Sequence, residues 1–114
     1  EQGDSDAQYN LGRYYDHGRG VTKSLKDAFH WYNCSAKQNH ALAMYNVGTM
    51  FHTGEGTEKN IVLAYKWVFL ATKYAHPNVS DDILKQIQGY VEKILADMNR
   101  EQFLEGEKLI SKWK

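Results

Sequence analysis

The sequence repeats itself after 36 residues, and this duplication constrains the fold more than any other feature. When the chain is shifted by 36 positions, ten of the 31 residues from Ala7 to Lys37 meet an identical residue, where ordinary composition would give roughly two. The two segments are therefore copies of one packing unit. The identical pairs are Ala7/Ala43, Tyr9/Tyr45, Asn10/Asn46, Gly12/Gly48, Gly18/Gly54, Gly20/Gly56, Lys23/Lys59, Ala28/Ala64, Trp31/Trp67 and Lys37/Lys73.

Each copy has the pattern of two helices joined by a glycine turn. In the first copy, apolar residues recur at helical spacing from Ala7 to Tyr15 and stop at residues 17–20, and a second amphipathic stretch follows over about 25–38. Gly18 and Gly54 suit the left-handed residue that ends a helix. The pattern predicts an all-α superhelical solenoid of antiparallel helix pairs.

Two details of the duplicated unit predict how its helices pack. Gly12 and Gly48 lie inside helices, where glycine costs about 1 kcal/mol relative to alanine, so we expect a close approach of the partner helix, at Ala28 or Ala64. The repeat also predicts that Trp31 and Trp67 have similar surroundings. Outside the duplicated unit, Gly89 marks either a bend or a surface glycine.

The chain is short enough for a single domain, which the repeat divides into four parts. Residues 1–6 are expected to be the tail of a preceding repeat, 7–42 and 43–78 the two repeats, and 79–114 a C-terminal capping helix pair. Ser80 is expected to begin the first capping helix, and Asn99 with Gln102 resembles a capping box for the second.

Composition excludes several classes of protein. Lys plus Arg number 14 and Asp plus Glu number 14, so no basic surplus favours nucleic acid as a partner. The longest nearly uncharged apolar run, residues 67–71, is far shorter than the roughly 20 residues of a membrane helix. Cys34 is the only cysteine, which excludes an internal disulfide.

No catalytic or metal site is predicted, and no cofactor is expected. The five histidines include no pair at the i, i+3 or i, i+4 spacing of a helical metal site. Asp16, His17 and His52 are the one group that would hold an ion if stacking brought the three side chains together. Side chains at the ends of helices are more commonly solvated, which is the alternative. A regular solenoid offers a shallow groove rather than a closed pocket, which disfavours catalysis.

The repeat resembles a known family. The similarity is carried by Ala7-Gln8-Tyr9-Asn10-Leu11-Gly12, Tyr15, Gly18-Arg19-Gly20-Val21, Ala28, Trp31-Tyr32 and Ala36, which resemble the Sel1-like repeat. This resemblance implies a fold related to tetratricopeptide repeats and a role as adaptor or scaffold for protein partners. The terminal helices resemble those of bacterial members, for which a periplasmic or secreted setting is favoured over the cytoplasm.

Stacked first helices of such a solenoid line its concave surface, which is where we expect a protein or peptide partner to bind. Tyrosine and arginine are common in protein-binding hot spots. The alternative is that both tyrosines pack between repeats and both asparagines bond to neighbouring backbone. The candidate residues are Tyr9, Asn10, Arg13, Asp16, Tyr45, Asn46, Thr49 and His52.

Two functions of different kinds follow from these features. The first is an interaction module that binds its partner on the concave face. The second is a structural segment of a longer array, which acts as a scaffold and has no binding site of its own.

Overall fold

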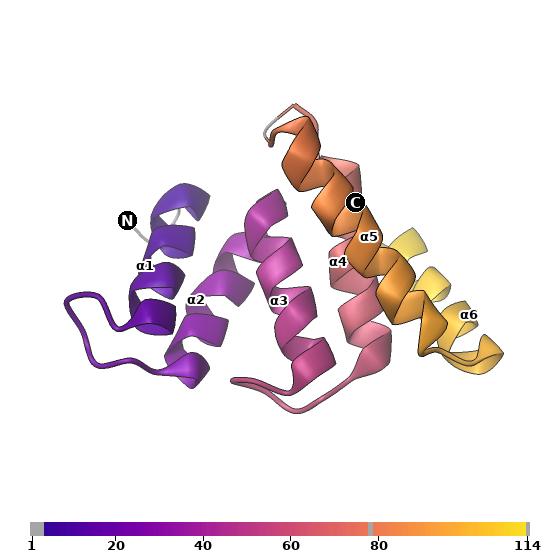
Figure 1. The fold of residues 1–114 in the computed structure, drawn as a ribbon, viewed down its shortest axis with the longest axis horizontal. Coiled ribbons are helices and arrows are strands. Elements are labelled where there is room, and N and C mark those ends of the chain that lie inside the picture. The colour runs from indigo at the N-terminus through magenta and orange to yellow at the C-terminus, as the bar shows by residue number, and fades with distance from the viewer. Residues whose placement is uncertain (1–3, 78, 114) are drawn as a thin grey trace.

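The computed structural model describes residues 4–77 and 79–113, which form six α-helices and no strand. In chain order these are α1 (Ser5–His17), α2 (Leu25–Ala36), α3 (Ala41–Thr53), α4 (Ile61–Ala75), α5 (Asp81–Ala96) and α6 (Arg100–Ser111). Figure 1 shows α1 to α4 side by side across the molecule, with α5 crossing in front of α4 and α6 at the far end. The predicted all-α solenoid is confirmed.

The helix ends agree with the signals in the sequence. Gly18 and Gly54 have φ values of +68° and +80°, so both end their helices in the left-handed conformation as predicted. Asn99 and Gln102 form the predicted capping box of α6. Helix α1 begins at Ser5, two residues before the repeat boundary expected at Ala7. The N-caps are Asp4, Ser24, His40, Asn60, Ser80 and Asn99.

The helices pack as two hairpins followed by two helices that share one support. Helix α1 packs against α2 and α3 packs against α4, while the contact of α2 with α3 joins the hairpins. Both α5 and α6 make their main contacts with α4 rather than with one another. Helix α4 is therefore the centre of the C-terminal half. None of the helices in the described residues is both long and apolar enough to cross a bilayer.

The helices approach closely at the two predicted glycines. On the partner helix, the contact is made mostly by the residue one turn after the predicted alanine. A Cβ on Gly48 would lie 2.2 Å from Val68 Cγ2 and 3.1 Å from the carbonyl oxygen of Ala64. A Cβ on Gly12 would lie 2.5 Å from Tyr32 Cδ1, so the contact expected at Ala28 is made by Tyr32. Gly89 is exposed, and apart from its chain neighbours and its own helix backbone no atom would lie within 4 Å of a Cβ, so it is a surface glycine.

The expectation of similar surroundings for the two repeat tryptophans is wrong. Trp67 is 4% exposed, because Trp113 at the end of α6 packs edge-on against it at 5.0 Å between ring centres. Trp31 is only half-buried and packs edge-on against His30. Only the second repeat has α6 packed beside its second helix, which accounts for the difference.

The crossing at Gly48 predicts a strong response to a single methyl group. In Gly48→Ala the new Cβ would also lie 3.0 Å from the backbone nitrogen of Val68, which cannot rotate away. The helices must separate, so we expect the free energy of unfolding to fall by about 1–3 kcal/mol. Gly89→Ala is the matched control, expected to raise it by up to about 1 kcal/mol. Urea denaturation followed by circular dichroism measures both, and a Gly48→Ala protein as stable as wild type would contradict the crossing.

Tyr32 joins the hairpin by a second interaction, because its hydroxyl donates a hydrogen bond of 3.0 Å to Asp16 Oδ2. Tyr32→Phe keeps the ring against Gly12 and removes only this bond, so we expect a loss of about 1–2 kcal/mol in the free energy of unfolding near neutral pH. An unchanged free energy of unfolding in this variant would show that the bond contributes nothing.

The same variant gives a pH-dependent prediction. Burial, and then the Asp16 carboxylate, raises the pKa of Tyr32 far above its ordinary value, whereas the unfolded chain ionises tyrosine near pH 10. The stability that Tyr32 contributes is complete below about pH 10 and declines as the pH rises toward the folded-state pKa. Denaturation at a series of alkaline pH values should show the stability advantage of wild type over Tyr32→Phe shrinking above about pH 10.

Candidate partner-binding face

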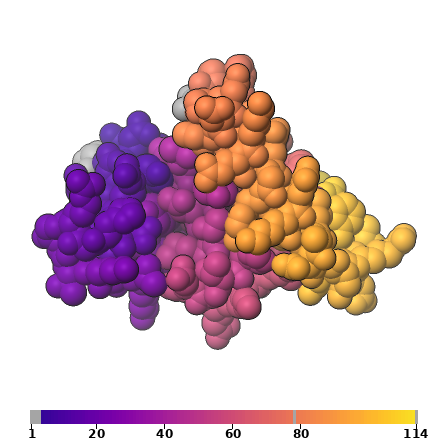
Figure 2. All heavy atoms as spheres, in the orientation of Figure 1, coloured from indigo at the N-terminus to yellow at the C-terminus, as the bar shows by residue number. Residues whose placement is uncertain are grey.

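Helices α1, α3 and α5 share one side of the molecule, which we call the α1/α3/α5 face. Two clefts open on it, one lined by α1 and α3 and the other by α3 and α5. In the space-filling view, α5 stands forward and the surface is lower between it and the N-terminal helices (Figure 2). Helix α3 therefore forms the floor between α1 and α5.

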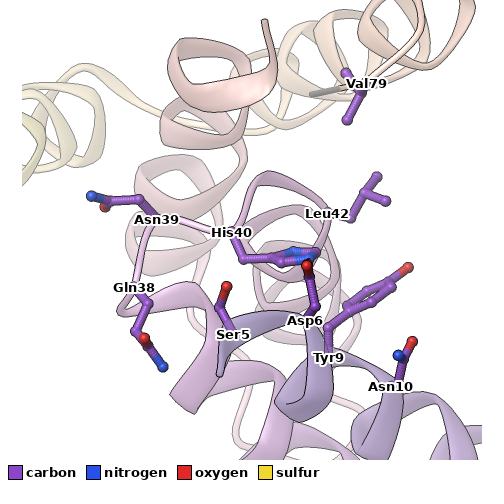
Figure 3. A pocket seen from close by; sticks show the side chains of 9 residues that line it. All are labelled: Ser5, Asp6, Tyr9, Asn10, Gln38, Asn39, His40, Leu42 and Val79. Atoms are coloured by element: carbon purple, nitrogen blue, oxygen red, sulfur yellow. The ribbon is translucent and has the colours of Figure 1, made fainter. Parts of the chain in front are cut away.

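The first cleft, which we call the junction cleft, lies where the first repeat meets the second. It has a volume of about 770 Å³. Figure 3 shows its wall from α1, the turn after α2 and the start of α3, with Val79 on the opposite side. Most of its lining side chains are polar, which favours hydrogen-bonded ligands over apolar ones. They are Ser5, Asp6, Tyr9, Asn10, Gln38, Asn39, His40, Leu42 and Val79.

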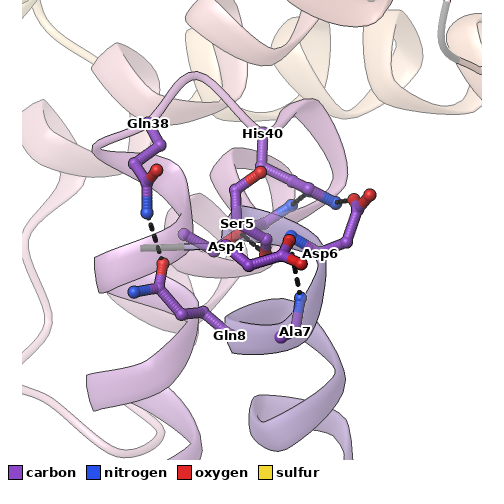
Figure 4. Close-up of polar contacts among 9 residues, drawn as sticks. Asp4, Ser5, Asp6, Ala7, Gln8, Gln38 and His40 are labelled. Atoms are coloured by element: carbon purple, nitrogen blue, oxygen red, sulfur yellow. Dashed lines mark hydrogen bonds and ion pairs between the residues drawn. The ribbon is translucent and has the colours of Figure 1, made fainter. Parts of the chain in front are cut away.

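His40 organises the junction cleft. Its Nδ1 accepts a hydrogen bond of 3.2 Å from the backbone amide of Ala43, so its Nε2 carries the proton and donates to Asp6 Oδ1 at 2.9 Å (Figure 4). The Tyr9 ring stacks on the imidazole at 4.7 Å between ring centres. His40 thus caps α3 and joins it to α1 with the same side chain.

Two further polar contacts join the start of α1 to the end of α2. Gln38 Nε2 donates to Gln8 Oε1 at 2.7 Å (Figure 4). Ser35 Oγ donates to the carbonyl oxygen of Ser5 at 2.7 Å. Gln8 and Ser35 are buried, and hydrogen bonds to buried polar groups are costly to break. We infer that the floor of the junction cleft is preorganised.

The second cleft, which we call the α3–α5 cleft, has a volume of about 700 Å³. His52 Nδ1 lies 2.6 Å from the Tyr90 hydroxyl, and His52 Nε2 lies 3.4 Å from Asp97 Oδ2. Burial, then Tyr45 and Asp97, raise the pKa of Tyr90, so its hydroxyl keeps its proton. The lining residues are His52, Thr53, Lys59, Ile61, Tyr90, Lys93 and Asp97.

The structure divides the eight candidate residues between two helices and two clefts. Helix α1 carries four of them, of which Tyr9 and Asn10 line the junction cleft, and α3 carries the other four, of which His52 lines the α3–α5 cleft. The five that line neither cleft are Arg13, Asp16, Tyr45, Asn46 and Thr49.

Several candidate side chains also make contacts within the fold. Tyr9 stacks on His40, the N-cap of α3, and Tyr45 packs edge-on against Tyr90 of α5, contacts of the kind that the packing alternative predicts. Thr49 Oγ1 donates to the carbonyl oxygen of Asn46 at 2.9 Å. Arg13 is exposed, with its guanidinium 6.0 Å from the centre of the Tyr9 ring.

The residues that the sequence analysis missed come from two places. Asp6 lies just before the first predicted repeat and His40 near its end, and both lie outside the two spans that hold the candidate residues, 9–16 and 45–52. Tyr90 and Lys93 lie on α5 and Asp97 is its C-cap, at i, i+3 and i+7, a spacing that indicates one helix face. The prediction of a capping helix considers no polar face, although the spacing of these three residues is a signal present in the sequence.

The possible approach of Asp16, His17 and His52 does not occur. The Asp16 carboxylate accepts from Tyr32, whereas His52 faces Tyr90 and Asp97. No group of three or more His, Cys, Asp or Glu side chains that could hold a metal ion is found in residues 4–77 and 79–113.

Comparison with known proteins agrees with this architecture. The pattern of the Sel1 repeat matches residues 5–40 and 41–73, one match for each hairpin. No curated protein matches the sequence. Sel1-like repeat proteins are generally protein-interaction or scaffold modules, and their fold is typically a non-catalytic helical scaffold.

Two solved structures are similar to the chain. A Sel1 repeat protein from Oxalobacter formigenes is 36% identical with a TM-score of 0.65, over 73% of this chain and 32% of that one. A protective antigen present in uropathogenic Escherichia coli strains, which displays an SLR fold, is 26% identical with a TM-score of 0.80, over 97% of this chain and 22% of that one. The chain thus spans a third or less of these proteins. Because the repeat pattern covers more than half of it, the chain belongs to the Sel1 repeat family.

Proposed function

We propose that this chain is an interaction module that binds a protein partner, or a peptide segment of one, on the α1/α3/α5 face. The observation that carries the proposal is the pair of clefts at opposite ends of α3, about 770 and 700 Å³ in volume. Leu42 lines one cleft and His52 the other, so their backbones are roughly 15 Å apart along the helix axis. This length suits a short extended segment, because a strand rises about 3.3 Å per residue.

The side chains between the two clefts support this role. Tyr45 and Thr49 of α3 are half-buried, so each offers a surface to a ligand while its position is held by neighbours. Asn10, which lines the junction cleft, and Arg13, one turn further along α1, are exposed and supply hydrogen-bond donors. Preorganised aromatic and polar groups reduce the entropy cost of binding.

We propose binding without catalysis. In both clefts the histidine nitrogens face groups that hold the ring in place, namely Asp6 and the Ala43 amide for His40, and Tyr90 and Asp97 for His52. Each of these ring nitrogens already has a partner within the fold, which supports a role in holding the cleft walls. The typical non-catalytic character of the Sel1 fold supports the same proposal.

The alternative is a structural segment whose faces contact neighbouring repeats of a longer array. The similar solved proteins are about three to five times longer than the part that aligns with this chain. A protein of that length would have further repeats to contact these faces. The two functions differ in what covers the α1/α3/α5 face. A partner would cover it in an interaction module, whereas other repeats of the same protein would cover it in a scaffold segment.

Site-specific photo-crosslinking tests the proposal without weakening the fold. A photoreactive amino acid is placed at Arg13 or Thr49 on the face, and at Lys26 of α2 or Lys73 of α4 as controls, in the protein at its natural length. We expect positions 13 and 49 to label the same partner protein and the control positions to label it weakly, because labelling needs direct contact. Mass spectrometry identifies the adducts.

Two outcomes would contradict the proposal. Equal labelling of the partner from all four positions would move the binding site away from the α1/α3/α5 face. Adducts of positions 13 and 49 confined to other repeats of the same protein would favour the scaffold segment instead.

A further inference from the structure

The α3–α5 cleft carries positive charge that the fold leaves unpaired. Lys59, just before α4, and Lys93, on α5, both line it and are exposed. The ion pairs in residues 4–77 and 79–113 are His40 with Asp6 and His52 with Asp97, so neither lysine has a carboxylate within ion-pair distance in that part of the chain. The Lys93 ammonium instead lies 5.5 Å from the centre of the Tyr90 ring.

The single carboxylate in the cleft lining does not cancel this charge. Asp97 Oδ2 lies 3.4 Å from His52 Nε2, so the imidazole occupies one side of that group. Glu58 and Glu92 are the acidic neighbours in sequence, and neither lines the cleft. Two ammonium groups therefore face one carboxylate that is already engaged, and the cleft favours an anion.

The walls of the cleft favour a carboxylate on an apolar stem. Ile61 and Tyr90 are half-buried lining residues, which provide apolar surface beside the two ammonium groups. Charge pairs gain strength where apolar walls reduce access of water. The chain as a whole has a formal net charge of zero, so no overall basic surplus favours a nucleic acid backbone over a carboxylate.

We propose that the α3–α5 cleft receives an acidic side chain from an extended segment of the protein partner, with Lys59 and Lys93 as its direct ligands. His52, Tyr90 and Asp97 form the frame that holds the wall of the cleft in place. This inference rests on the proposed function of the α1/α3/α5 face, and adds to it the chemistry of the partner.

A titration with a defined acidic peptide tests the inference. The whole chain, labelled with ¹⁵N, is titrated at low ionic strength with blocked tetraglutamate and, separately, with blocked tetraglutamine of the same length. We expect tetraglutamate to shift the backbone amide signals of Lys59, Lys93 and His52, and tetraglutamine to leave them in place. Added salt should weaken the effect, because it screens exposed charges.

Paired charge-removing variants locate the binding. Lys59→Gln/Lys93→Gln is expected to weaken the affinity for tetraglutamate by about tenfold or more, because both direct ligands are lost. Lys26→Gln/Lys85→Gln makes the same change in net charge at exposed lysines outside the cleft, and should keep the affinity within about twofold.

Three results would overturn the inference. They are no shift with tetraglutamate, equal weakening in the two double variants, and tighter lysine-dependent binding of a short oligothymidylate, which would indicate a phosphate ligand. The photo-crosslinking experiment does not depend on this titration. If positions 13 and 49 label a partner while tetraglutamate fails, the proposed function stands and only the acidic chemistry is wrong.

Discussion

The architecture depends on helices that approach one another closely where one of them has no side chain. Gly12 makes room for the Tyr32 ring and Gly48 for Val68, while Gly106 of α6 makes room for Tyr65 of α4. A glycine in a helix interior costs about 1 kcal/mol, which the packing of a large partner side chain offsets. Both repeat hairpins and the docking of α6 on α4 share this arrangement, so the close spacing of these three helix pairs depends on three glycines.

That spacing also determines which residues stay accessible on the α1/α3/α5 face. Helix α5 packs against α4 but carries Tyr90 across to Tyr45 and His52 of α3, and His40 likewise joins α3 to α1 through Asp6. The same contacts that stabilise the stack shape the walls of the two clefts. Packing between repeats and partner binding are therefore compatible at these positions. One side of a half-buried ring packs within the fold, and its other side is accessible to a ligand.

The two clefts lie at opposite ends of α3 and differ in chemistry. The junction cleft is lined mainly by amide and hydroxyl groups with one carboxylate, whereas the α3–α5 cleft combines two lysines with Ile61 and Tyr90. The second cleft also contains residues of α5, which does not repeat the sequence of α1 and α3. Within a Sel1 solenoid, such departures from the repeat are where specificity for a partner can be built without altering the helix stack.

The sequence by itself determined the local structure: the 36-residue repeat, the left-handed glycines 18 and 54 and the Asn99 capping box depend on residues close together in the chain. Only the tertiary structure decided that Trp113 covers Trp67, and that Tyr90, Lys93 and Asp97 meet His52. These contacts join residues far apart in sequence whose relative position depends on how α5 and α6 rest on α4. The periodicity of the repeat predicts which residues are neighbours within a copy. It carries no information about the packing of α5 and α6, which follow the second copy and do not repeat its sequence.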